Sequence, residues 1–563
     1  MKTFTCRALI VLVSVITLSA KAAIDKPVVM DEAMISITVS DFHGFMNEVG
    51  GVAAQISPMM SGEMIKGMIG MQLGDPSLAG IPAGSGLSVV ALDITNIFAV
   101  VEVAEAQSTG YINAAQAKGL QAQYADGALV LASNTNVLTN GVTHLSRVKS
   151  KLLAARSPTL RIAMQPATMI DRTREAIDGF MTMLPGLMGQ SMMSQPGATL
   201  DSAQSMTKIL EAELIFLLSV AEQCEVAEVV LAPKGGSLQI NETFVPKAGT
   251  ALAALVNAPA VNKVNPKLQA GVLGEGMILF DFHYANLDAL ATFVAIETEK
   301  LMKQLKVEDV DTASIVSNMK KWMGIYGGTG CQLVDFGDED EMQVRYVMEV
   351  RDEASVLEVL KNMPADMAPF LKLYESMGVA MTMEFKENAS KAGEVNVHQL
   401  MVKMDCSAMP AAQQEQMKEM GLENMVYDLA ITDGMMFYSA PGEMATLIKK
   451  VKEGDAATRL KARSVYPEGG FYYFDLDMGE YMAFAASILP DTPETSMVKQ
   501  QMSVLFAGVE PVTSAGFKQG GQVMWSLNLP GELLAKYGQM IMMMQMQQMQ
   551  QQQVDAPPAA PAQ

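Results

Sequence analysis

Gly80-Ile81-Pro82-Ala83-Gly84-Ser85-Gly86-Leu87-Ser88-Val89-Val90 returns later in the chain as Gly324-Ile325-Tyr326-Gly327-Gly328-Thr329-Gly330-Cys331-Gln332-Leu333-Val334. Three glycines, the isoleucine and the final valine match without a gap, at an offset of 324 − 80 = 244 residues. Self-similarity at a fixed spacing is typical of a repeated structural unit. The rest of the chain aligns around this stretch as two copies of one unit.

Four further segments repeat in the same order. Each copy opens on an alternating apolar run that ends in Asp-Phe-His, and each closes on a Gly-Gly turn followed by a strand pattern. The offset in residue number between matching segments increases from 240 to 247, rises to 307 and then falls to 285. Insertions in either copy would produce such changes. The paired segments are Ile35–His43 with Met277–His283, Val100–Val103 with Val347–Val350, Asp126–Leu131 with Asp433–Tyr438, and Gly235–Ile240 with Gly520–Trp525.

The pattern of elements predicts the fold class. Strand patterns come in adjacent pairs with short turns, and helical patterns separate the pairs. In Met342–Val350, Met342, Val344, Tyr346, Met348 and Val350 alternate with polar residues, which predicts a strand with one buried face. We therefore expect an α+β fold of two tandem homologous domains, each an antiparallel sheet covered by helices.

The domain boundaries follow from the repeat. We expect a signal peptide over residues 1–22, a first repeat domain over 23–264 and a second over 265–540, with the junction near Asn262–Lys267. The second copy contains an inserted hairpin near 381–404, and the first contains a Met-, Gly- and Pro-rich loop over Leu184–Ala198. Residues 541–563 form a low-complexity tail, first Met/Gln and then Pro/Ala, whose end is expected to be disordered.

The first residues carry an export pattern. Lys2 and Arg7 precede or flank the apolar run Ala8–Leu18, and Ala20-Lys21-Ala22 is a small-x-small cleavage site. We expect export through the Sec pathway to a bacterial periplasm or beyond. Removal of the peptide leaves Cys224, Cys331 and Cys406, which allow at most one internal disulfide, and we favour three buried thiols. The run Leu214–Val220 is too short to cross a bilayer, so no transmembrane segment is expected in the mature chain.

The charge excludes one class of partner. The formal net charge of −21 repels phosphate backbones, so nucleic acid is not an expected partner. The glycine stretch does not point to a nucleotide either, because no Gly-Lys-Ser/Thr follows it and a strand, rather than a helix N-terminus, comes next. We interpret it as a turn that needs positive φ at Gly84, Gly86, Gly328 and Gly330.

Two Asp-x-His pairs are the most suggestive candidates for metal or acid–base chemistry. Asp41 and His43, like Asp281 and His283, stand where a strand passes into a helix. Asp is a favoured helix N-cap, and Asp477 occupies a similar junction without any histidine, so we expect capping. Ser146-x-x-Lys149 lacks the Ser-Asp-Asn and Lys-Thr-Gly motifs that accompany a nucleophilic serine of this kind. The remaining histidines are His144 and His398.

Methionine is the compositional anomaly, at 48 residues. Thioethers bind Cu(I), and Met542, Met546 and Met549 of the tail would share one helical face. Methionine also occurs throughout the strand patterns, which favours its use as a pliable core residue or as the lining of an apolar pocket.

These observations favour a non-enzymatic, exported bacterial protein of the cell envelope with a binding or scaffold role. No catalytic or cofactor-binding residue and no cofactor is predicted. The first alternative is a carrier of an apolar ligand, or of Cu(I) through the Met-rich segments. A hydrolase or metal-dependent enzyme is the third reading.

Overall fold

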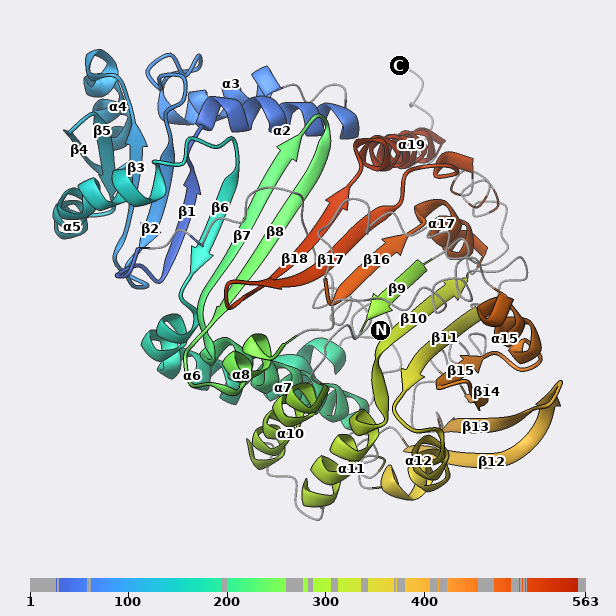
Figure 1. The fold of residues 1–563 in the computed structure, drawn as a ribbon. Helices are drawn as coiled ribbons and strands as arrows, with labels where there is room; N and C mark the ends of the chain where they lie inside the picture. Colours follow the sequence, from blue (N-terminus) through green and yellow to red (C-terminus); the bar gives the residue numbers. More distant parts are fainter. Residues whose placement is uncertain are drawn as a thin grey trace.

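The computed structural model describes residues 30–57, 62–193, 200–259, 277–281, 287–304, 312–335, 343–368, 380–405, 423–453, 470–487 and 504–554, with isolated positions at 27, 371, 414, 496, 499 and 502. The fold is mixed α and β, as predicted. The described strands belong to one antiparallel sheet of eighteen strands (Figure 1).

The order of strands begins at one edge with β4. The first half of the sheet consists of β4 (Gln121–Ala125), β5 (Ala128–Ala132), β3 (Ile97–Glu102), β2 (Leu87–Ala91), β1 (Ile35–Val39), β6 (Leu160–Met164), β7 (Cys224–Lys234) and β8 (Ser237–Pro246). The second half continues with β18 (Gln522–Leu529), β17 (Val512–Gln519), β16 (Tyr472–Leu476), β9 (Met277–Asp281), β10 (Tyr326–Asp335), β11 (Gln343–Val350), β15 (Met435–Ser439), β14 (Asn424–Thr432), β13 (Val395–Asp405) and β12 (Ala380–Ala392).

β8 and β18 pair at the centre, so the sheet is continuous. This differs from the expectation of a separate sheet in each domain. Outward from that pair, the strands of the two halves follow the same order once the hairpin β12–β13 is set aside. On one side the order is β8, β7, β6, β1, β2, β3, β5 and β4. On the other side it is β18, β17, β16, β9, β10, β11, β15 and β14. The additional hairpin β12–β13 lies where one was expected, near 381–404, and extends the second half.

The described helices lie at the strand ends and on both faces. They are α2 (Phe42–Ile56), α3 (Gly62–Leu73), α4 (Glu105–Ala117), α5 (Thr135–Arg147), α6 (Pro166–Met193), α7 (Leu200–Glu222), α8 (Ala251–Asn257), α10 (Leu287–Gln304), α11 (Thr312–Gly324), α12 (Glu353–Asp366), α15 (Met444–Glu453), α17 (Met478–Ser487) and α19 (Gly531–Val554), with a π-helical turn over Val148–Leu152. Figure 1 shows α2, α3 and α19 along one end of the strands, and α6, α7, α8 and α10 along the other.

The helix starts have local causes. The carboxylate of Asp41 accepts from the backbone N–H of Gly44 at 3.0 Å and caps α2, as expected. Asp477 caps α17 in the same way, through the N–H groups of Gly479 and Glu480. These side chains satisfy amide groups that have no partner inside the helix.

Two sequence expectations about local structure were wrong. α6 extends to Met193, so residues 184–193 of the expected loop are helical; Met, Leu and Gln are strong helix formers and outweigh Pro185 and the glycines there. β11 does not have only one buried face. Val347, on the opposite face from Met348, is fully buried, because α15 packs on one face and α12 on the other.

Candidate ligand-binding hollow

One face of the sheet is apolar across both halves. Residues directly opposite one another in paired strands share a face, so the register identifies its members. A cross-strand row runs Val89, Ile37, Ile162, Val229, Glu242, Trp525, Gly516 and Tyr472. We call this side the apolar face and define it by Ile35, Ile37, Val89, Ile162, Val229, Leu231, Ile240, Phe244, Leu527, Phe474 and Leu279.

The apolar face remains partly accessible to solvent. Apart from Ile37, its defining side chains are intermediate in exposure, and Ile37 is 38% exposed. Its outer strands are covered, by α4 over β4 and β5 and by α12 over β11 and β14. The central strands carry the open part of the face.

The opposite face carries small polar side chains on β1 and β2 among its buried apolar residues. Ser36, Thr38 and Ser88 lie there and are buried, and the hydroxyls of Thr38 and Ser88 are 2.7 Å apart. On β1 and β2, Ser36, Thr38 and Ser88 are therefore buried together with Val90, whereas Ile35, Ile37 and Val89 on the apolar face stay partly exposed. A sheet with one solvated face normally shows the opposite arrangement.

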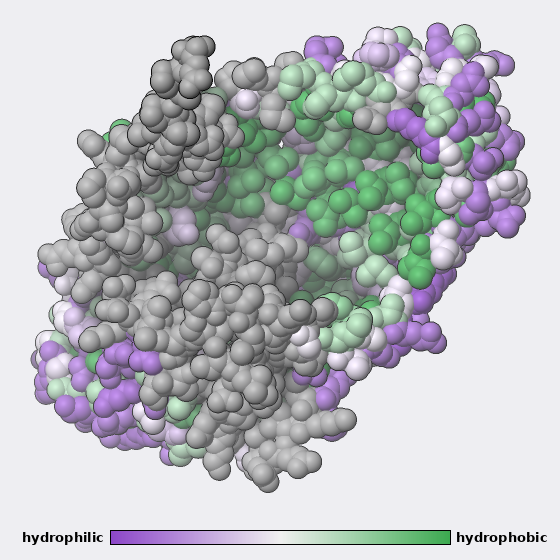
Figure 2. All heavy atoms as spheres, turned by 180° about the vertical axis from the view of Figure 1, so that it is seen from behind, coloured by the Kyte–Doolittle hydropathy of each residue, from purple (hydrophilic) through white to green (hydrophobic). Residues whose placement is uncertain are grey.

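One side of the molecule is hollowed. Figure 2, seen from the side opposite to Figure 1, shows a hollow whose visible floor is coloured as apolar. Two helix pairs stand at the two ends of the strands: α2 packs on α19, and α8 packs on α10. Each pair contains one helix from each half of the chain.

Glu242 is the one acidic side chain in the cross-strand row. It exposes 4% of its surface, and its Oε2 is buried without a hydrogen-bond partner among the described residues. Burial raises the pKa of this carboxyl from 4.5 to about 8. No charged neighbour contributes to that shift. At neutral pH most of the Glu242 side chains are therefore protonated in the protein alone.

Aromatic rings gather beside Glu242. Trp525 is its Cα partner on β18, and the Trp525 ring meets Phe244 at 5.4 Å and Phe471 at 5.9 Å, both edge to face. Gly516, the next residue in the row, leaves room for these rings: a Cβ there would lie 2.9 Å from Cδ1 of Trp525. α8 packs on this cluster through Leu252 and Val256.

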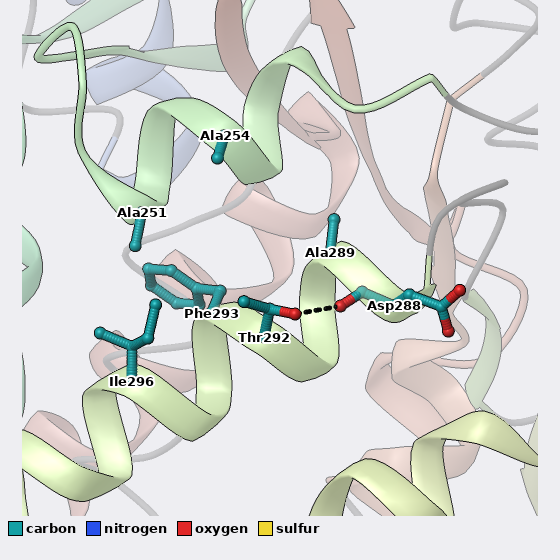
Figure 3. A pocket seen from close by; sticks show the side chains of 7 residues that line it. All are labelled: Ala251, Ala254, Asp288, Ala289, Thr292, Phe293 and Ile296. Carbon is teal, nitrogen blue, oxygen red and sulfur yellow. Dashed lines mark hydrogen bonds between the residues drawn. The ribbon is translucent and has the colours of Figure 1, made fainter.

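A separate pocket of about 300 Å³ lies between α8 and α10. Phe293 and Ile296 point into it from α10 and Ala251 and Ala254 from α8 (Figure 3). Its polar contribution comes from Asp288 and Thr292, and the Thr292 hydroxyl is already donated to the Asp288 carbonyl. The pocket contains no convergent set of polar groups.

The helices at this end are joined by a buried polar network. Glu297 of α10 accepts from Ser219 Oγ at 2.6 Å, Gln223 Nε2 at 2.8 Å and Lys300 Nζ at 2.8 Å. Burial opposes ionisation of Glu297, but these hydrogen bonds outweigh it and lower its pKa. Gln223 also accepts from the N–H of Leu252, which ties α8 to the end of α7.

The first Asp-x-His pair has structural contacts. Asp41 caps α2, and His43 Nε2 lies 2.7 Å from the carbonyl oxygen of Ile81. His43 therefore fixes α2 to the glycine stretch. Of the second pair, the side chain of Asp281 and all of His283 lie outside the described residues.

The remaining histidines also occupy structural positions. His398 accepts from the N–H of Asn388 and stacks on Phe385, and burial lowers its pKa. His144 stacks on Phe98.

The glycine stretch is held by an ion pair. Glu102 accepts from the Gly86 N–H at 2.8 Å and pairs with Arg156, whose Nη1 also reaches the Gly84 carbonyl at 2.9 Å. The expectation of positive φ is confirmed at Gly84 (+73°) and Gly328 (+125°) and is wrong at Gly86 and Gly330. Gly86 is needed for space instead, since a Cβ there would lie 2.8 Å from the Val39 carbonyl oxygen.

The structure describes the methionine and cysteine candidates only in part. α19 includes positions 542, 546 and 549, and Met542 is 36% exposed, whereas the side chains of Met546 and Met549 lie outside the described residues. Cys224 and Cys331 are buried free thiols, and burial raises the Cys224 pKa to about 11. Cys406 lies outside the described residues. Among the described residues, no group of three or more His, Cys, Asp and Glu side chains could hold a metal ion.

Sequence reasoning did not single out Glu242. The signal was present: Leu238, Ile240, Glu242 and Phe244 alternate in one strand, and a carboxylate stands where an apolar residue fits the pattern. The described part of the chain contains no helix that meets the length and hydropathy needed for a membrane span. No protein-family model, no curated protein and no solved structure matches the chain.

Proposed function

We propose that this chain is a non-enzymatic binding protein that holds the apolar part of an amphipathic ligand against the apolar face. The observation that carries the proposal is a row of partly exposed aliphatic side chains on strands whose other face is buried. Ile37 and Ile162 pair across β1 and β6 on the half-exposed face, while Ser36 and Thr38 are buried on the other.

Burial of this face by a ligand supplies the binding free energy. Covering a half-exposed aliphatic side chain gains about 1 kcal/mol, since full burial gains roughly 1.5–3 kcal/mol. Several such side chains in one row are enough to retain a long alkyl chain. The preformed sheet also limits the entropy lost on binding.

The chain is also proposed to be an internal duplication of residues 23–264 and 265–540. The repeated glycine stretch and the equal strand order of the two sheet halves support this proposal. A duplicated unit joined at β8 and β18 produces one long face from two short ones, which suits an elongated ligand. Export through the Sec pathway remains a proposal that rests on residues 1–22.

The test is native mass spectrometry of the protein purified from its own cells, followed by organic extraction of any bound amphiphile. The variant Ile37→Ser with Ile162→Ser places two hydroxyls on the apolar face and is expected to lose most of the ligand. Ile94→Ser is the matched control, because Ile94 is 67% exposed in a turn outside the sheet. Equal ligand content in both variants, or no bound amphiphile and no uptake of a fluorescent apolar probe by the original chain, contradicts the proposal.

A further inference from the structure

Glu242 lies where the aromatic cluster meets the open part of the apolar face. Its neighbours in the row are Val229 on β7 and Trp525 on β18, and Ile240 and Phe244 flank it on its own strand. None of these four side chains ionises. The carboxyl is thus a buried polar group on the apolar face, with Oε2 unpartnered among the described residues.

A buried carboxyl group among apolar side chains is unfavourable unless a hydrogen-bond partner or a counter-ion satisfies it. Removal of a carboxylate from water without a counter-ion costs several kcal/mol in proteins. Lys518 of β17 lies on the same face, and its ammonium group donates to the Ala258 carbonyl. Oε2 of Glu242 has no partner among the described residues, so Lys518 does not satisfy it.

The surroundings of Glu242 fit a cation better than any other ligand group. Rings of Trp, Tyr and Phe attract ammonium groups through their negative faces, and Trp does so most strongly. Trp525 stands directly opposite Glu242, with Phe244 and Phe471 around it. The net charge of −21 also raises the local concentration of cationic ligands.

We propose that the ligand of the apolar face is an amphiphile with an amine-derived cationic head group, which pairs with the carboxylate of Glu242 beside the ring of Trp525. This inference rests on the proposed function and specifies its ligand class. The alkyl chain lies along the row toward Ile162 and Ile37. The head group replaces the proton that Glu242 carries in the free protein.

The exchange of this proton for the head group determines how the affinity for the ligand depends on pH. Because the free carboxyl has a pKa of about 8, a permanently cationic ligand must displace a proton at lower pH. Its affinity therefore rises by about tenfold per pH unit up to pH ~8 and levels off above it. An uncharged amphiphile displaces no proton, so its affinity stays constant over the same range.

The test is calorimetric titration of the full chain with dodecyltrimethylammonium, dodecyl maltoside and dodecyl sulfate, each below its micelle concentration, at about pH 6 and about pH 9. Dodecyltrimethylammonium is expected to bind about a hundredfold more tightly at the higher pH and to release a proton at the lower one. Glu242→Gln keeps the side-chain shape and is expected to abolish both effects while it retains dodecyl maltoside binding.

The outcomes separate the two proposals. If dodecyl maltoside binds but the cationic probe shows no preference and no dependence on Glu242, the head-group assignment is wrong and the apolar site stands. If dodecyl sulfate binds most tightly, the assignment is also wrong. If none of the three binds, the proposed function itself fails.

Discussion

Asn241 of β8 lies directly opposite Ser526 of β18, at the centre of the pairing that joins the two halves of the sheet. Both side chains carry a buried oxygen without a hydrogen-bond partner among the described residues, Asn241 Oδ1 and Ser526 Oγ. The strand order outward from this pair is the same on both sides. The junction is therefore held by backbone hydrogen bonds and packing rather than by these side chains.

Ser526→Ala is expected to leave the free energy of unfolding unchanged or to raise it by up to about 1 kcal/mol, because it removes a buried hydroxyl that gains no hydrogen bond. Ser88→Ala is the matched control. Ser88 is equally buried, but its loss leaves the hydroxyl of Thr38 unpaired and is expected to cost about 1–3 kcal/mol. Urea unfolding of both variants measures the difference, and an equal cost for both contradicts the assignment.

Glu242 should make the protein less stable as pH rises. Its folded-state pKa of about 8 lies above its ordinary value of 4.5, so the native state holds the proton more tightly than the unfolded chain. Its contribution is fully present below about pH 4.5 and is lost as pH rises to about 8, by at most about 5 kcal/mol. Glu242→Gln should flatten this part of the stability profile in urea titrations without ligand. An unchanged slope in that variant would assign the pH dependence to other groups.

The contribution of Glu297 to the free energy of unfolding should change with pH in the opposite direction to that of Glu242. The pKa of Glu297 is lowered in the fold, so its contribution is present above the ordinary carboxyl pKa and is lost as pH falls through the folded value. Glu297→Ala removes the acceptor shared by Ser219, Gln223 and Lys300 and is expected to cost about 2–3 kcal/mol at neutral pH. Glu299→Ala, at an exposed salt bridge on the same helix, should cost much less, because solvent screens that pair. Thermal unfolding of both variants at two pH values provides the comparison.

Asp41→Ala is expected to lower the free energy of unfolding by about 1 kcal/mol, because α2 loses its N-cap. Asp41→Asn keeps an oxygen acceptor and should be close to neutral. A metal or catalytic role for Asp41 would instead make the Asn variant lose ligand binding while its stability stays unchanged.

Three glycine variants distinguish backbone conformation from space. Gly84→Ala forces a positive φ on alanine and is expected to cost about 1–2 kcal/mol. Gly86→Ala places a Cβ 2.8 Å from the Val39 carbonyl oxygen and from Leu153, so it should cost at least as much, about 1–3 kcal/mol. Gly67→Ala lies in α3 with nothing within 4 Å of the new Cβ, and should stabilise by about 0.5–1 kcal/mol. Destabilisation by Gly67→Ala would contradict this ordering.

Local patterns predicted the elements better than their assembly. Alternation in Met342–Val350 and the capping position of Asp41 identified a strand and a helix start, because both depend on neighbouring residues. The pairing of β8 with β18 depends on residues far apart in sequence. The pattern of apolar and polar residues in either strand does not indicate which other strand it pairs with. The helix over 184–193 was not predicted, because Pro185 and the nearby glycines are typical of a loop. The high helix propensity of the methionines in this segment was given less weight. Glu242 could have been noticed from its place among Leu238, Ile240 and Phe244.

The central pairing also sets an order of events during synthesis. β8 ends at Pro246, and its partner β18 begins only at Gln522. While the ribosome makes the residues between them, β8 has no neighbour on that side and presents unpaired N–H and C=O groups to other chains. Such long-range pairing forms slowly, and incomplete chains are prone to aggregate through the free strand. Truncation before Gln522 should therefore produce an insoluble product even if the first half of the chain has all its own strands.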